Sequence, residues 1–188
     1  MNGVDAAVPG PTTASPPRSG ASFPAMRRAK VPRSIVAGPY GHPFHPVAVT
    51  IPIGAWSSSL VFDLLGFAAD DPRGFAQGSR WLIAIGLGGA VGASVLGLLD
   101  FSRIPKGTPA RRTAIAHLAL NVTAMVLFSI GLLVRLLDLG RVPGVAFLLS
   151  AIAAAGLSAS GWLGGKLAYR WGVRVADENT QREGFEPA

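Results

Sequence analysis

The sequence contains no cysteine, which excludes disulfide bonds, thiolate catalysis and metal or iron–sulfur centres held by cysteine. Charged residues are also scarce: they make up 14% of the 188 residues, whereas soluble domains usually carry about 25%. The chain lacks a phosphate-binding loop, a nucleophile elbow, a zinc-protease motif and a dinucleotide fingerprint. A membrane protein without a catalytic constellation is the simplest interpretation of these absences.

Apolar residues are abundant instead, at 49% of the chain, together with 24 glycines. They gather in four long segments, and we predict helices over about residues 46–69, 81–101, 110–137 and 142–168. Each apolar segment is close to the ~20 residues that a bilayer requires, and the short connections favour antiparallel neighbours. The sequence therefore predicts an all-α integral membrane protein, folded as an up-down bundle of four transmembrane helices.

The two ends of the chain differ from this membrane domain, which we place at residues 39–175. Residues 1–38 are rich in Pro, Ala, Ser and Gly, contain five basic residues and have no apolar core of signal-peptide length. We predict that they form a disordered basic arm. Residues 176–188 are polar, and we predict a short disordered tail.

The distribution of Lys and Arg predicts the orientation of the bundle. Thirteen of the seventeen basic residues fall in the arm, the loop between the second and third helices, and the C-terminal part of the chain. The other side holds only four: Arg73, Arg80, Arg135 and Arg141. Loops rich in Lys and Arg stay in the cytoplasm, so the side with thirteen basic residues is predicted to be cytoplasmic. We therefore predict a bacterial inner-membrane protein with both termini in the cytoplasm. This distribution also accounts for the net charge of +7 without a nucleic-acid partner, for which the sequence has no motif.

A cluster of polar residues is predicted near the cytoplasmic ends of the helices. One histidine begins the first helix, an acidic residue ends the second, and a histidine and an asparagine lie four residues apart on one face of the third. The cluster and its near neighbours are His42, His45, Asp100, Arg103, His117 and Asn121. Lipid offers such groups no hydrogen bonds, so they need partners inside the protein.

Three chemistries fit this cluster. His45 and His117 could ligate one b-type haem, with Asp100 and Asn121 orienting the imidazoles and Arg103 nearby. Alternatively, His42, His45, His117 and Asp100 could hold a divalent metal. In the third interpretation the cluster is structural, and His117 and Asn121 form hydrogen bonds with Asp100 or with a backbone carbonyl freed near a proline.

A separate acidic residue, Asp63, lies 18 residues after His45, or roughly 27 Å along a helix at ~1.5 Å per residue. It therefore belongs to the opposite membrane face. There it is predicted to form a salt bridge with Arg80 or Arg135, and a role in proton transfer is the alternative. Arg135 itself is predicted to be an interfacial anchor.

The sequence resembles a bacterial membrane-protein family catalogued as domain of unknown function 2231. The resemblance covers roughly residues 41–175 and rests on several short motifs. They are His42-Pro43-Phe44-His45-Pro46, Pro52-Ile53-Gly54, Phe62-Asp63, Gly97-Leu98-Leu99-Asp100, Arg112 through His117 to Asn121, Gly161-Trp162-Leu163-Gly164-Gly165, Tyr169 and Gly172-Val173.

This resemblance implies four membrane helices and, because some relatives resemble small cytochrome b proteins or occur with Rieske-type iron–sulfur domains, a redox role and a Rieske-type partner. The chain itself carries no Rieske centre because it lacks cysteine, and its three histidines allow one bis-histidine haem at most. Our leading hypothesis is a redox or electron-transfer accessory subunit with one b-type haem between His45 and His117. The alternative is a cofactor-free structural, accessory, or proton- or small-solute-conducting membrane protein whose polar cluster only stabilises the bundle.

Overall fold

The computed structural model describes residues 22–186, and over this range every regular element is helical. Four of the helices it describes are long and apolar enough to cross a membrane, as the sequence predicts. The elements are α1 Ser22–Lys30, η1 Ile35–Ala37, α2 His45–Ala48, α3 Thr50–Ala68, α4 Arg73–Phe101, α5 Pro109–Leu137, α6 Gly144–Gly165, the π-helical turn η2 Lys166–Arg170, α7 Glu178–Arg182 and η3 Glu183–Phe185. Helices α2 and α3 together form the first span.

The local sequence explains where the helices begin and end. Thr108 caps α5 by accepting a hydrogen bond of 3.1 Å from the Arg111 backbone N–H, and Pro109 occupies the first helical position, where a missing N–H costs nothing. Helix α4 begins at Arg73, eight residues before the predicted start at 81. The prediction followed the apolar segment, whereas the helix continues through a polar turn that lies beyond it.

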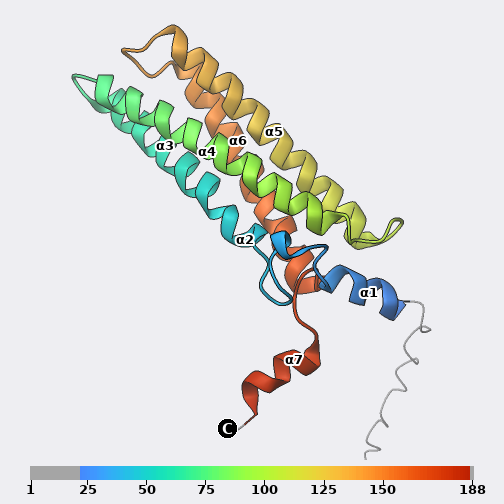
Figure 1. Cartoon of the computed structure of the whole chain (residues 1–188). Helices are drawn as coiled ribbons and strands as arrows, with labels where there is room; N and C mark the ends of the chain where they lie inside the picture. Colours follow the sequence, from blue (N-terminus) through green and yellow to red (C-terminus); the bar gives the residue numbers. More distant parts are fainter. Residues whose placement is uncertain (1–21, 187–188) are drawn as a thin grey trace, which may run out of the picture.

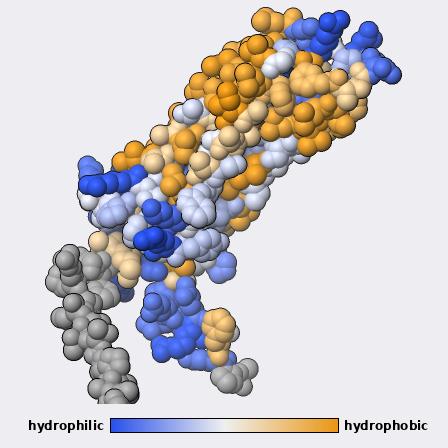
Figure 2. All heavy atoms as spheres, turned by 180° about the vertical axis from the view of Figure 1, so that it is seen from behind, coloured by the Kyte–Doolittle hydropathy of each residue, from blue (hydrophilic) through white to orange (hydrophobic). Residues whose placement is uncertain are grey.

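The four spans form two antiparallel hairpins, α3–α4 and α5–α6, which lie side by side (Figure 1). Between the hairpins, α4 contacts α5 and α3 contacts α6, so α3 and α5 are diagonal and run in the same direction. Hydrophobic side chains cover most of the long body seen in Figure 2, and hydrophilic ones gather at its two ends. This is the surface that a bilayer-spanning bundle requires.

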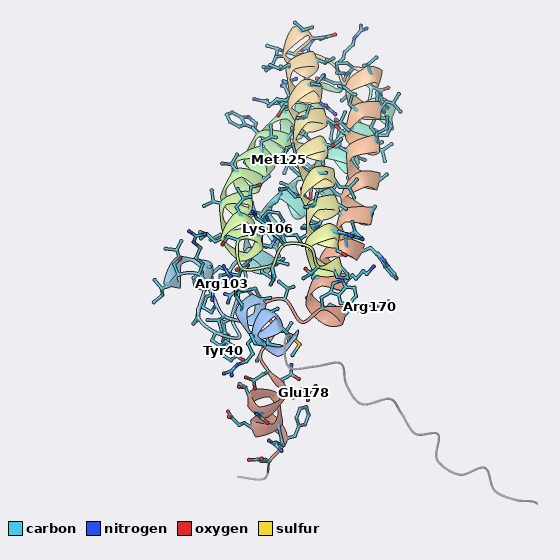
Figure 3. All side chains as sticks on the ribbon, turned by 90° about the vertical axis from the view of Figure 1, so that its right-hand side faces the viewer. Tyr40, Arg103, Lys106, Met125, Arg170 and Glu178 are labelled. Carbon is cyan, nitrogen blue, oxygen red and sulfur yellow. The ribbon has the colours of Figure 1, made fainter. Side chains whose placement is uncertain are left out.

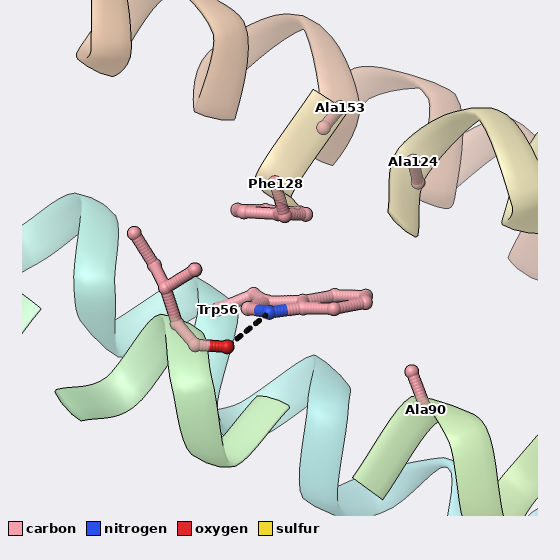
Figure 4. Packing of buried hydrophobic residues seen from close by; sticks show 6 residues of the cluster. Trp56, Ala90, Ala124, Phe128 and Ala153 are labelled. Carbon is pink, nitrogen blue, oxygen red and sulfur yellow. Dashed lines mark hydrogen bonds between the residues drawn. The ribbon is translucent and has the colours of Figure 1, made fainter. Parts of the chain in front are cut away.

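Large aromatic side chains fill the centre of the bundle, where small residues surround them. The indole of Trp56 stacks on the ring of Phe128, with centroids 4.2 Å apart and planes at 11°. The indole N–H donates to the Ile83 carbonyl at 3.3 Å, so its one polar atom is satisfied inside the membrane. Ala90, Ala124 and Ala153 complete this core (Figure 4).

The two ends of the described chain meet at one end of the bundle, in a cap that the sequence did not predict (Figure 1). Tyr40 donates to the Asp177 carboxylate at 2.9 Å, and the Asp177 N–H donates back to the tyrosine oxygen at 2.8 Å. Hydrogen bonds from the Thr180 N–H and the Tyr40 hydroxyl lower the pKa of Asp177. Lys30 donates to the carbonyls of Val175 and Ala176.

Parts of both end segments are helical in the structure. Residues 22–38 contain α1 and η1, and residues 178–185 form α7 and η3, because hydrogen bonds between the two termini hold both segments. The rest of the predicted arm, residues 1–21, and the last two residues of the tail lie outside the described residues. Arg103, Lys106 and Arg170 lie at the same end as the cap (Figure 3).

The core predicts opposite effects for two glycines on α4. A Cβ added to Gly86 would lie 2.3 Å from the Trp56 indole nitrogen, whereas one added to Gly88 meets nothing within 4 Å. Gly86→Ala should therefore destabilise the protein by about 1–3 kcal/mol through overpacking. Gly88→Ala should be neutral or stabilising by up to about 1 kcal/mol, because alanine favours a helix over glycine. Thermal unfolding in detergent measures both, and equal midpoints would contradict this packing.

Candidate functional site

Two histidines face each other inside the bundle, near its capped end. His45 is the first residue of α2, and His117 lies in the third turn of α5. Their ring centroids are 6.4 Å apart and their planes are at 89°. These are the two residues that the sequence predicts as a ligand pair.

A backbone carbonyl of the neighbouring helix holds each imidazole. His45 Nδ1 lies 2.9 Å from the Ala93 carbonyl oxygen, and His117 Nδ1 lies 2.8 Å from that of Ser160. A carbonyl can only accept, so each ring carries its proton on Nδ1 and leaves the Nε2 lone pair available. This is the arrangement that usually orients histidine ligands.

A glycine supports each imidazole ring. A Cβ on Gly97 would lie 3.0 Å from His45 Cε1, and one on Gly164 would lie 3.3 Å from His117 Cε1. Each glycine stands four residues after the carbonyl that anchors the same ring, on the same helix face. The two halves of the site are therefore built alike.

Asn121 adds hydrogen bonds to one half of the site. Its amide nitrogen lies 2.7 Å from the Ser160 hydroxyl, 2.8 Å from the His117 carbonyl oxygen and 3.2 Å from His117 Nε2. An amide has two hydrogens, so at most two of these three contacts can be hydrogen bonds at one time. The predicted contact of Asn121 with His117 is present.

The other predicted residues do not join this pair. Asp100 lies 2.8 Å from the Arg174 guanidinium as an ion pair, so it does not orient the imidazoles; backbone carbonyls do. Arg103 donates to the Val31 carbonyl, and His42 is exposed, with its ring 3.3 Å from the Tyr40 carbonyl. Within residues 22–186, no three His, Asp or Glu side chains lie close enough to share a metal ion. The four-ligand metal alternative is not assembled.

The histidine pair is the first of three pairs along the bundle axis. Trp56 and Phe128 stand 11 residues after the two histidines, and Asp63 and Arg135 stand 18 residues after them. The aromatic rings stack, and the two charged side chains form a buried ion pair. Residues at equivalent positions of α3 and α5 therefore meet at three successive levels.

Burial follows the same repeat. On α3 and α5 the shared buried positions are 72 residues apart: Pro52 with Ala124, Trp56 with Phe128, Ser59 with Gly131, and Asp63 with Arg135. On α4 and α6 they are 67 residues apart: Ser79 with Ala146, Ile83 with Ser150, Gly86 with Ala153, and Ala93 with Ser160. The two hairpins are thus related by a pseudo-twofold axis along the bundle, on which the histidine pair lies.

The charged pair at the opposite end is fully enclosed. Asp63 and Arg135 are 0% and 1% exposed, and the guanidinium also donates to the Gly131 and Ala146 carbonyls and to the Ser150 hydroxyl. The predicted salt bridge of Asp63 therefore forms with Arg135, whereas Arg80 donates to the Leu139 carbonyl. The prediction that Arg135 is an interfacial anchor is wrong, because its side chain turns inward to this carboxylate.

The pseudo-twofold axis predicts that the two charges can be exchanged. Asp63→Arg or Arg135→Asp alone places like charges in a buried site and should cost about 3–5 kcal/mol or more. The double exchange restores opposite charges, and the carbonyls of Ser59 and Ser79 occupy the positions equivalent to those of Gly131 and Ala146. We expect it to recover more than half of the loss in thermal unfolding.

The exposed pair Asp71 and Arg73, 3.8 Å apart, provides the control, because exchanging its charges should change stability little. A double exchange at Asp63 and Arg135 that is no more stable than the single variants would show that the two positions are not equivalent.

Comparison with known proteins agrees with this architecture. No curated protein and no solved structure matches the chain. A family described as "Predicted membrane protein (DUF2231)" matches residues 41–177, which contain both hairpins and all three axial pairs. The chain belongs to this family of predicted membrane proteins.

Proposed function

We propose that the protein is a redox accessory subunit that holds one b-type haem between His45 and His117. The observation that carries the proposal is the pair of imidazoles on the pseudo-twofold axis. Each ring donates Nδ1–H to a backbone carbonyl, at 2.9 and 2.8 Å, so its Nε2 carries the lone pair that could bind a metal. Facing imidazoles in a four-helix bundle are a common way to ligate haem iron.

The separation of the rings fits a shared iron. Metal–imidazole nitrogen distances are about 2.0–2.1 Å, so two imidazoles on opposite sides of one ion have centroids about 6 Å apart. The observed separation is 6.4 Å. His42 is exposed and belongs to the cap, so the site supports a single bis-histidine haem.

The surrounding residues would tune and protect the group. A bound haem would supply one-electron transfer. The Ala93 and Ser160 carbonyls fix the ring orientation and increase the basicity of the imidazoles. The buried Trp56 and Phe128 stack closes the axis below the histidines and excludes water from that side.

We further propose that the protein lies in the bacterial inner membrane with its capped end in the cytoplasm. Many basic side chains lie at this end, among them Arg103, Lys106 and Arg170 (Figure 3), as positive-inside topology requires. The histidine pair would then lie toward the cytoplasmic side. A Rieske-type iron–sulfur protein is the redox partner that family analogy suggests.

A cofactor-free role is the second candidate, and one observation favours it. Asn121 places its amide nitrogen 3.2 Å from His117 Nε2, which would satisfy this nitrogen without a metal. The histidines would then act as hydrogen-bonding groups that stabilise the bundle or conduct protons.

Haem binding predicts a visible spectrum that depends on two of the three histidines. The detergent-purified protein, produced with adequate haem supply, should show a Soret band and sharp bands after reduction with dithionite. His45→Ala and His117→Ala should each remove most of this absorbance, because each removes an axial ligand. His42→Ala is the matched control and should keep the spectrum. A folded wild-type protein with no absorbance would leave the cofactor-free role.

The angle between the rings offers a second readout of a bound haem. Two imidazole ligands with perpendicular planes would make two d orbitals of low-spin iron nearly equal in energy, which would give a highly anisotropic electron paramagnetic resonance signal. If His45 and His117 held the group at their 89° angle, the largest g value should be well above that of a complex with parallel imidazoles. A rhombic signal typical of parallel planes would contradict this ring geometry.

A further inference from the structure

We infer that Arg174 is a positioning residue for His45. It binds both the segment that precedes α2 and the end of α4, and so holds His45 in place. The inference rests on the proposed function, in which His45 is a haem ligand. The positioning of His45 itself can be tested without haem. Arg174 lies in the C-terminal segment after η2 and is 3% exposed.

The backbone of Arg174 is unusual. Its φ is 61°, and among the described residues it is the one non-glycine residue with a positive φ. This conformation is unfavourable for a side chain with a Cβ and persists only where the surroundings impose it. The Arg174 N–H donates to the Ala29 carbonyl at 3.1 Å, which anchors the turn to α1.

The guanidinium connects three segments. Its Nη2 donates to the Ala37 and Gly38 carbonyls at 2.8 and 3.0 Å, and its Nη1 lies 3.4 Å from the Lys30 carbonyl oxygen. Its Nε lies 2.8 Å from the Asp100 carboxylate on α4. One side chain thus fixes the N-terminal segment against the last turn of α4.

Both sides of this contact lead to His45. The Ala37 carbonyl also accepts from the Phe44 N–H at 3.2 Å, directly before the histidine. Gly38 has φ 90°, and a Cβ there would lie 2.2 Å from the His42 carbonyl oxygen, so the turn is tight. On the other side, Asp100 stands three residues after Gly97, on which the His45 ring rests.

The two histidines differ in their need for such support. His117 lies within α5, where helix on both sides fixes its backbone. His45 occupies the equivalent position on the pseudo-twofold axis but is the first residue of its helix, so no helical turn precedes it. The Arg174 contacts provide for His45 what the first turns of α5 provide for His117.

Chemical modification by diethyl pyrocarbonate, mapped by mass spectrometry, tests this with the three histidines as separate reporters. In the wild-type protein without haem, His42 should react fast, and His45 and His117 slowly. Arg174→Ala should raise the rate at His45 several-fold toward that of His42 and leave His117 slow. A rise at both His45 and His117 would indicate general loosening and would overturn the inference.

Three further variants separate the parts of the effect. Arg174→Gly relieves the strain of the positive φ but lacks the guanidinium, so it should raise the reaction rate of His45 as Arg174→Ala does. If His45 in Arg174→Gly reacts as slowly as in the wild-type protein, the role belongs to the backbone turn alone. Arg174→Lys keeps the charge with fewer donors and should restore protection in part. Arg170→Ala removes an exposed arginine from the same region and should change nothing.

The haem-loaded protein gives an independent readout. Arg174→Ala should lower haem occupancy several-fold and broaden the anisotropic resonance signal, because His45 no longer has one orientation, whereas Arg170→Ala should keep both. Wild-type protein that binds no haem but shows the expected modification pattern would overturn the proposed function and leave the positioning of His45 intact. Unchanged modification and resonance in Arg174→Ala would overturn the positioning alone.

Discussion

The buried ion pair of Asp63 and Arg135 is the interaction that sets the register of the bundle. Neither charge can face lipid without a large cost, so the pair forms only when α3 and α5 stand at one relative height. Helices rise about 1.5 Å per residue, and this height then aligns Trp56 with Phe128 and His45 with His117. The site at one membrane face thus depends on a contact near the other.

Small residues on the second helix of each hairpin leave room for the aligned side chains of α3 and α5 to meet. Gly86 and Ala153 leave room for the central aromatic rings, and Gly97 and Gly164 do the same for the imidazoles. Because α3 and α5 are diagonal, only large side chains reach across the axis, and small ones on α4 and α6 let them do so. The carbonyls beside these glycines then supply the acceptors that apolar surroundings otherwise lack.

Hydropathy predicted the four spans because the bilayer length is a strong constraint, and the short connections predicted their antiparallel order. Hydropathy placed the start of α4 too late and did not reveal the helices at the two ends of the described chain, because polar helical turns and contacts between distant segments carry no apolar signal. Arg174 was missed as a partner of Asp100, since its acceptors include backbone carbonyls up to 144 residues away. The equal spacings from His45 to Asp63 and from His117 to Arg135 were present in the sequence and could have revealed both the repeat and the true partner of Asp63.

The same ion pair sets a condition on the two hairpins. In a dimer of two identical hairpins, equivalent positions carry the same residue, so an acid at this level would face another acid and a base another base. Opposite charges can stand at such positions only when the two hairpins differ in sequence. The Asp63–Arg135 contact therefore distinguishes the two halves of this chain: neither hairpin could pair with a second copy of itself in this way, because the meeting side chains would then carry like charges.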